Sequence, residues 1–252
     1  MDLEKYSMKE ANKLIKQRFN DFMKAEGFVK QKRTTSQFFR VKEHFIQHFW
    51  LNISSHVPEI ECYIYPAYLY ENGYSIYAKK DLFLLQEQLP KEHQKIDFVD
   101  IIDDFGKYPS KKLDEVWNNN KYLMKEIMIP YLDTMNFEKT AKLFMDKKDE
   151  MFNIQTGTEF QFNIIELTLA GIFLLKGDYP EGYKRLKEVK NFFFQKAQQF
   201  KGEDDWLFET KADYINKLLR ILEDKAENWE CTLQNEIAEA EKITLRMFGM
   251  RI

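Results

Sequence analysis

The amino-acid sequence predicts an α+β protein in which an antiparallel meander of four to five strands, flanked by helices, precedes an all-helical region. Three observations support this fold class. Apolar residues alternate with a period of two between Phe28 and Tyr77, they recur every three or four residues after Lys79, and neither Gly nor Pro occurs from Glu203 to Phe248. The predicted division is an α+β domain over residues 1–150 and a helical domain or extension over residues 151–252.

The N-terminal part is expected to hold one helix followed by the sheet. Apolar residues at helical spacing, ending at Phe22 and Met23, predict an amphipathic helix over 3–25, and Gly27 supplies a stop signal. Both residues of Asn72-Gly73 tolerate a positive φ, which makes this dipeptide the strongest hairpin signal in the chain. The predicted strands cover residues 28–33, 37–41, 45–53 and 60–70, with a return strand after Asn72-Gly73.

The segments after the sheet are expected to be helical. Pro130 should kink or stop the segment 113–135, because proline lacks the amide hydrogen that a helix interior uses. The segments 160–176 and 180–200 resemble a single tetratricopeptide-type helical hairpin, with Gly177 at the turn and the small residues Ala170 and Gly182 where the helices approach. The predicted helical segments cover residues 98–105, 113–135, 137–152, 160–176 and 180–200.

The C-terminal segment, 203–248, has no residue that stops a helix. At a rise of ~1.5 Å per residue, one continuous helix would be about 70 Å long, which exceeds the dimension of a compact chain of this size. We therefore expect a break around residues 228–234, with Trp229 buried in the helical core. An apolar stripe of period 3.6 favours packing within one chain, so a monomer or weak dimer is expected.

Composition excludes several classes of protein. A chain of 252 residues with 44% hydrophobic and 31% charged residues and a net charge of −3 is typical of a folded globular protein. Its two cysteines, Cys62 and Cys231, form no CxxC pair, so neither a disulfide framework nor a zinc knuckle is predicted. The most apolar segment, 164–175, is too short to span a bilayer and contains Glu166, which predicts a buried helix. Without a secretory signal, the expected location is cytoplasmic, with no membrane contact.

A basic stretch between residues 28 and 42 is the first candidate binding site. Lys30, Lys32, Arg33 and Arg40 could bind phosphate groups, and the neighbouring aromatic residues could stack on bases. However, strand geometry divides these cations between two faces, and lysine is common on edge strands. We therefore expect a hairpin edge here, and no tight binding of nucleic acid.

A set of tyrosines in the predicted last hairpin is the second candidate. If exposed, these side chains could recognise a peptide or a base, because tyrosine offers a large rigid surface and a hydroxyl group. The alternative is that tyrosine, which has a high β propensity, fills the half-buried face of the sheet. The candidate residues are Tyr63, Tyr65, Tyr68 and Tyr70.

Histidines and acidic residues predict no metal site. His44 and His48 would lie on one face of a strand but roughly 13 Å apart, too far to share one metal ion. The acidic residues between Asp97 and Asp104 alternate with apolar residues at helical spacing, which places them on a solvated face. Since no recognised catalytic or nucleotide-binding motif occurs, we predict no catalytic residue and no cofactor.

Several short motifs resemble an uncharacterised bacterial family, domain of unknown function 4304. These motifs are a helix that ends in Gly-Phe at 27–28, the basic strand 29–33, the runs 38–40, 50–55 and 62–65, and the helix 122–132. The resemblance covers approximately residues 10–145. It implies an α+β fold and carries no activity.

Two functions follow as hypotheses. The first is a bacterial protein-interaction module without enzymatic activity, such as an immunity or accessory protein that binds another protein. The alternative is a nucleic-acid-associated protein or hydrolase that uses the basic N-terminal hairpin.

Overall fold

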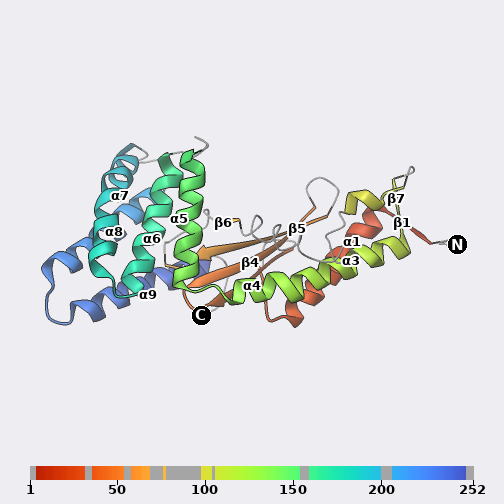
Figure 1. Cartoon of the computed structure of the whole chain (residues 1–252), viewed down its shortest axis with the longest axis horizontal. Helices are drawn as coiled ribbons and strands as arrows, with labels where there is room; N and C mark the ends of the chain where they lie inside the picture. Colours follow the sequence, from red (N-terminus) through yellow and green to blue (C-terminus); the bar gives the residue numbers. More distant parts are fainter. Residues whose placement is uncertain are drawn as a thin grey trace. The chain divides into compact units, whose positions relative to one another are not determined.

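The computed structural model describes residues 4–31, 36–53, 58–68, 76–77, 98–103, 106–153, 159–199 and 206–247 (Figure 1). The fold is α+β, with an antiparallel sheet in the N-terminal half and an all-helical C-terminal region, which confirms the predicted class. The chain forms two compact units. The sheet unit comprises residues 1–42, 46–65 and 77–134, and the helical unit comprises residues 43–45, 66–76 and 135–252.

The main sheet has five strands whose spatial order follows the sequence. Its first pairing, β2 with β3, is antiparallel and places Val29 opposite Phe39 and Lys30 opposite Phe38. The meander is therefore present, while the predicted Asn72-Gly73 turn lies outside the described residues. The strands are β2 (Val29–Lys30), β3 (Gln37–Lys42), β4 (Phe45–Asn52), β5 (Glu59–Pro66) and β6 (Ile76–Tyr77).

A small second sheet was not predicted. Strand β1 (Lys5–Ser7) pairs antiparallel with β7 (Lys107–Pro109), so that Tyr6 lies opposite Tyr108. The first helix, α1 (Met8–Ala25), consequently begins later than the predicted residue 3. Ser7 ends the strand and caps the helix in a capping box with Glu10, in which each side chain bonds the backbone N–H of the other residue.

Helix α1 packs on one face of the main sheet. Phe19 meets Phe38 of β3 edge to face, with ring centroids 5.6 Å apart. At the end of the helix, Gly27 has a φ of +81°, and the amides of Gly27 and Phe28 donate to the carbonyls of Lys24 and Met23. This Schellman motif confirms Gly27 as the stop signal and turns the chain into β2.

A long helical segment from Ser110 to Asp133 completes the sheet unit. It consists of α3 (Ser110–Leu123), a π-helical turn over Met124–Met128 and α4 (Ile129–Asp133). Pro130 has no N–H to donate, and the π turn accommodates it by shifting the bonding, so that the Ile129 amide bonds the Met124 carbonyl. Pro130 therefore changes the register of the helix, which ends at Asp133. The predicted helix over 98–105 is replaced by a single 3₁₀ turn, Phe98–Ile101, in the part of it that the structure describes.

The helical unit is an array in which each helix packs on the next along the chain (Figure 1). Helix α6 is buried around most of its circumference, as predicted. Its one buried carboxylate, Glu166, pairs with Lys148 of α5 and, at 2.5 Å, with Arg185 of α7. The helices are α5 (Phe137–Asn153), α6 (Glu159–Leu175), α7 (Tyr179–Gln199), α8 (Trp206–Asp224) and α9 (Trp229–Met247).

Helices α6 and α7 form the predicted helical hairpin. Gly177, with a φ of +81°, makes the turn, and its amide donates to the Leu174 carbonyl. A Cβ atom added at Gly182 would lie 2.5 Å from Leu174 Cδ2 and 3.3 Å from the Ala170 carbonyl oxygen. The two helices therefore approach closely because position 182 has no side chain.

The helical unit also includes short segments from the strand region, which are Glu43–Phe45 and, within the described chain, residues 66–68 and Ile76. The ring of Tyr68 lies against Gly171 of α6, and its hydroxyl donates to the Thr168 carbonyl at 3.1 Å. Phe45 contacts both Tyr68 and Phe137 edge to face. Because α5 packs on α6, the compact units divide between Thr134 and Met135, earlier than the predicted boundary at residue 150.

Candidate functional site

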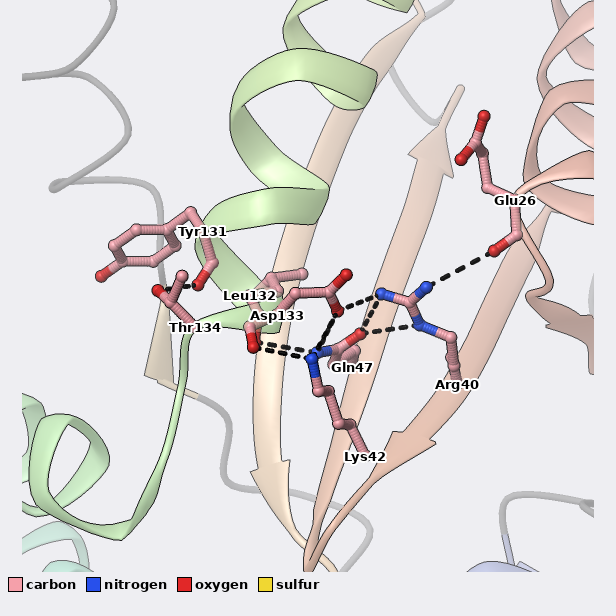
Figure 2. A network of polar contacts seen from close by, with 8 residues as sticks. All are labelled: Glu26, Arg40, Lys42, Gln47, Tyr131, Leu132, Asp133 and Thr134. Carbon is pink, nitrogen blue, oxygen red and sulfur yellow. Dashed lines mark hydrogen bonds and ion pairs between the residues drawn. The ribbon is translucent and has the colours of Figure 1, made fainter.

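The basic residues of the first predicted site do not form a free cationic surface where the structure describes them. Lys30 is half-buried in β2, which lies at the edge of the sheet. Arg40 and Lys42 lie on β3 and both reach Asp133 at the end of α4 (Figure 2). Lys32 and Arg33 lie outside the described residues.

Arg40 is the centre of this polar network (Figure 2). Its guanidinium donates to Gln47 Oε1 through Nε at 2.9 Å and Nη2 at 2.7 Å, and Nη2 lies 2.5 Å from Asp133 Oδ1. The same group lies over the ring of Phe28, 4.5 Å from its centroid. Arg40 is thus held by a carboxylate, an amide and an aromatic ring, which leaves it poorly placed to bind a phosphate.

Lys42 and Gln47 cap the C-terminal end of α4 (Figure 2). Lys42 Nζ donates to the Asp133 carbonyl at 2.7 Å, and Gln47 Nε2 donates to the Leu132 carbonyl at 2.9 Å. The last carbonyls of a helix have no partner within the helix and carry its negative dipole end, so a cation and an amide stabilise them. The network therefore fixes the helical segment to the sheet.

The predicted tyrosine surface is not an exposed ladder. Tyr63 and Tyr65 are each only 8% exposed, Tyr68 is fully buried and Tyr70 lies outside the described residues. The alternation along β5 places Tyr63 and Tyr65 on one face of the sheet, where their rings lie 6.2 Å apart. The described tyrosines thus fill protein interior, which was the alternative considered for them.

His48 lies among these tyrosines as a buried, neutral side chain. Its ring stacks between Phe39 and Tyr63, at 4.3 Å and 5.3 Å between centroids, and Nδ1 lies 3.1 Å from the Tyr65 hydroxyl. Desolvation by burial lowers the pKa of His48 to about 3. Nε2 has no hydrogen-bond partner among the residues that the structure describes. Beside it, the Tyr63 hydroxyl donates to the carboxylate of Glu61 on the same strand. Through Phe39, His48 and Tyr63, this cluster joins β3, β4 and β5.

His44, in the turn before β4, and His48, on β4, contact different sets of residues. His44 stacks on Phe137 and pairs with Glu241 of α9, within the helical unit, whereas His48 belongs to the sheet unit. Among the described residues, no group of three His, Cys, Asp or Glu side chains could hold a metal ion.

A groove between α8 and α9 is one concave site in the described part of the helical unit. The chain bends between these helices over residues 225–228, where Lys225 and Asn228 adopt positive φ values of 42° and 62°. This bend is the predicted helix break, and it comes slightly earlier than expected. The groove has a volume of about 220 Å³ and is lined by Lys217, Arg220, Ile221, Asp224, Ala226, Trp229, Thr232 and Glu236.

Trp229 and Ile221 are the large apolar side chains that line the α8–α9 groove, and both are half-buried, so we call them its floor. The indole meets Tyr179 edge to face, with centroids 4.7 Å apart, and Lys225 Nζ lies 5.7 Å above it. Trp229 is half-buried, so the prediction that it lies within the helical core was wrong. As the first residue of α9, it sits at the bend, where neighbouring helices cannot enclose it.

Charged side chains form the rim of the α8–α9 groove. Lys217 and Glu236 face one another across it and pair at 2.6 Å. Arg220 and Asp224 are exposed, one turn apart on α8, and make no ion pair within the described chain. Neither residue could be singled out from the sequence, because their position on the rim depends on the angle at which α9 leaves the bend.

Comparisons of the chain with family models, curated proteins and solved structures found no match. The resemblances to domain of unknown function 4304 and to a tetratricopeptide hairpin therefore stay predictions. None of the helices in the described ranges is both long and apolar enough to cross a membrane.

Proposed function

We propose that this protein is an interaction module without enzymatic activity, and that it binds a partner protein at the α8–α9 groove. The observation that supports this proposal most directly is Trp229, a half-buried indole on the floor of a groove with a charged rim. An apolar centre with a polar rim is the usual composition of a protein interface, and Trp and Arg are the residues that most often dominate its binding energy.

The charges of the rim also support a protein partner over a nucleic acid. Asp224 and Glu236 line the groove beside Arg220 and Lys217, so a phosphate backbone would meet carboxylates as well as cations. In the basic N-terminal hairpin, Arg40 and Lys42 are paired with Asp133. Among the residues that the structure describes, neither surface presents the excess of unpaired Lys and Arg on which phosphate binding depends.

Affinity capture tests the proposed function. The immobilised full-length protein is incubated with a lysate of its source organism, and retained proteins are quantified by mass spectrometry. The wild type should retain one protein in stoichiometric amount. Trp229→Ala should lose it, because truncating a central interface tryptophan costs at least about 2 kcal/mol, or roughly 30-fold in affinity.

Met145→Ala is the matched control, because Met145 is a large apolar side chain of the same unit that is 44% exposed and does not line the groove. This variant should retain the partner. Equal retention by the wild type and Trp229→Ala would contradict the proposal, as would capture of no stoichiometric partner.

A further inference from the structure

We infer that the segment bound in the α8–α9 groove carries one large apolar side chain between an acidic and a basic residue. This inference rests on the proposed function and names the chemistry of the partner. It follows from which charges of the groove are already neutralised within the chain and which are left for a ligand.

Two of the four rim charges neutralise one another. Lys217 Nζ lies 2.6 Å from Glu236 Oε2, which leaves no net charge on that part of the rim. Arg220 and Asp224 are both exposed and make no ion pair in the part of the chain that the structure describes, not even with each other at i,i+4 spacing. Among the residues that line the groove, a ligand therefore meets one unpaired cation and one unpaired anion, Arg220 and Asp224, while Lys225 adds a positive charge over the indole.

The positions of these two charges set the spacing that the ligand must match. Four residues along a helix span about 6 Å, which is close to two residues of an extended peptide or one turn of a helical one. Asp224 is the last residue of α8, where the negative end of the helix dipole adds to its carboxylate. A basic ligand side chain is therefore favoured beside Asp224, and an acidic one beside Arg220.

The floor of the groove selects the residue between them. Trp229 and Ile221 offer apolar surface, and Tyr179 and Lys225 already contact the indole. A single large aliphatic or aromatic side chain fits a groove of about 220 Å³, whose volume lies below the usual range for drug-sized ligands. Ligands with charges of one sign are disfavoured, because each would meet Arg220 or Asp224 as a like charge.

Peptide selection tests the inference without requiring the natural partner. A random linear peptide library displayed on phage is selected against the immobilised full-length wild type and against Arg220→Glu, Asp224→Lys and Trp229→Ala. Wild-type selections should enrich an apolar residue with an acid on one side and a base on the other. Arg220→Glu should replace the enriched acid by a base, and Asp224→Lys should replace the enriched base by an acid.

Fluorescence anisotropy with one enriched peptide then gives the size of the effect. Arg220→Glu should weaken binding at least tenfold, and changing the acid of the peptide to lysine should recover most of that loss. Lys184→Glu, a charge reversal on an exposed lysine of α7 outside the groove, should change the affinity less than twofold. Circular dichroism melting of each variant verifies that it is folded.

The outcomes separate the two proposals. Peptides whose binding depends on Trp229 but not on Arg220 or Asp224 would overturn the inference and leave the proposed function standing. Peptides that carry charges of one sign only, and whose binding depends on Trp229, would also overturn the inference and leave the proposed function standing. Enrichment of no peptide, or only of peptides that bind Trp229→Ala as tightly as the wild type, would overturn both.

Discussion

The imidazole of His48 lies in an environment that disfavours its charged form, because burial lowers its pKa to about 3. It is 4% exposed, stacked between two aromatic rings, and bonded to Tyr65 through Nδ1. The segment around it could be predicted to be a strand, and residues 45–52 do form β4. Its burial could not be predicted, because it depends on Phe39 and Tyr63, which two other strands bring to the same face.

Acid should destabilise the protein through His48. The unfolded imidazole takes up a proton below its ordinary pKa of 6.5, whereas the folded one, with a pKa of about 3, does not. Between these two values the unfolded state binds more protons, so the free energy of unfolding should fall as the pH falls, by up to about 1.4 kcal/mol per pH unit from this residue. Urea unfolding at a series of pH values measures this slope.

His48→Phe is the control for the acid prediction. It keeps an aromatic ring in the stack and removes the titrating group, while every other ionisable residue is unchanged. Its free energy of unfolding should depend less steeply on pH than that of the wild type between pH 6.5 and 3. Parallel curves for the two proteins would show that His48 does not contribute.

At the scale of single elements, the features that could be predicted are those that depend on residues close together in the sequence. The amphipathic stripe of α1, the Gly27 stop and the α6–α7 turn at Gly177 all involve residues within a few positions of one another. The strands β1 and β7 escaped prediction, since three residues are too few to show a period and their pairing joins Lys5 to Pro109. The same holds for Arg40 and Asp133, which are distant in the sequence.

Two glycines of the α6–α7 hairpin should respond differently to alanine. A Cβ atom at Gly171 would overlap the buried ring of Tyr68, whose hydroxyl is bonded to the Thr168 carbonyl. A Cβ atom at Gly182 would lie 2.5 Å from Leu174 Cδ2, which is a less severe overlap than the 2.1 Å at Gly171 and involves an aliphatic side chain that can change rotamer. Gly171→Ala should therefore lower the free energy of unfolding by about 1–3 kcal/mol through overpacking, and Gly182→Ala by less.

Urea unfolding followed by circular dichroism compares these glycine variants. In both, alanine raises the intrinsic helix propensity by about 1 kcal/mol, so any loss of stability reflects the tertiary contact. Adding Tyr68→Leu to Gly171→Ala should reduce the penalty of the alanine, because the ring that it overlaps is then absent. Wild-type stability in Gly171→Ala would contradict the packing described for Tyr68.

At the scale of the whole molecule, the division into two regions could be predicted from the sequence, but which segments of the chain belong to each unit could not. The α+β class followed from the change of period after the strands. The membership of Glu43–Phe45 in the helical unit did not, because it depends on His44 meeting Glu241, nearly 200 residues later. The groove likewise requires the bend before Trp229. The approximate position of this bend was predicted from the sequence, but its angle was not.

The helical unit should not be stable as a simple C-terminal fragment. A fragment of residues 135–252 lacks Phe45 and Tyr68, whose rings pack on Phe137 and Gly171. Losing a buried aromatic side chain typically costs about 3–5 kcal/mol, a large fraction of the stability of a domain. Thermal unfolding of this fragment, followed by near-ultraviolet circular dichroism, should be broad and begin at a lower temperature than that of the full chain.

Co-expression of residues 1–134 is the control for the fragment, because it resupplies the two segments on a separate chain. The two fragments should co-purify and recover a cooperative transition. A fragment 135–252 that unfolds as cooperatively as the intact protein would show that the strand-region segments are dispensable.

The position of Tyr68 and Phe45 within the helical unit also bears on synthesis at the ribosome. Both residues leave the ribosome before their packing partners, Phe137 of α5 and Gly171 of α6, have been translated. At about 5–20 residues per second, the interval between Tyr68 and Gly171 is on the order of ten seconds. During this time the nascent chain carries two aromatic side chains without their packing partners, and such exposed apolar surface is prone to aggregate.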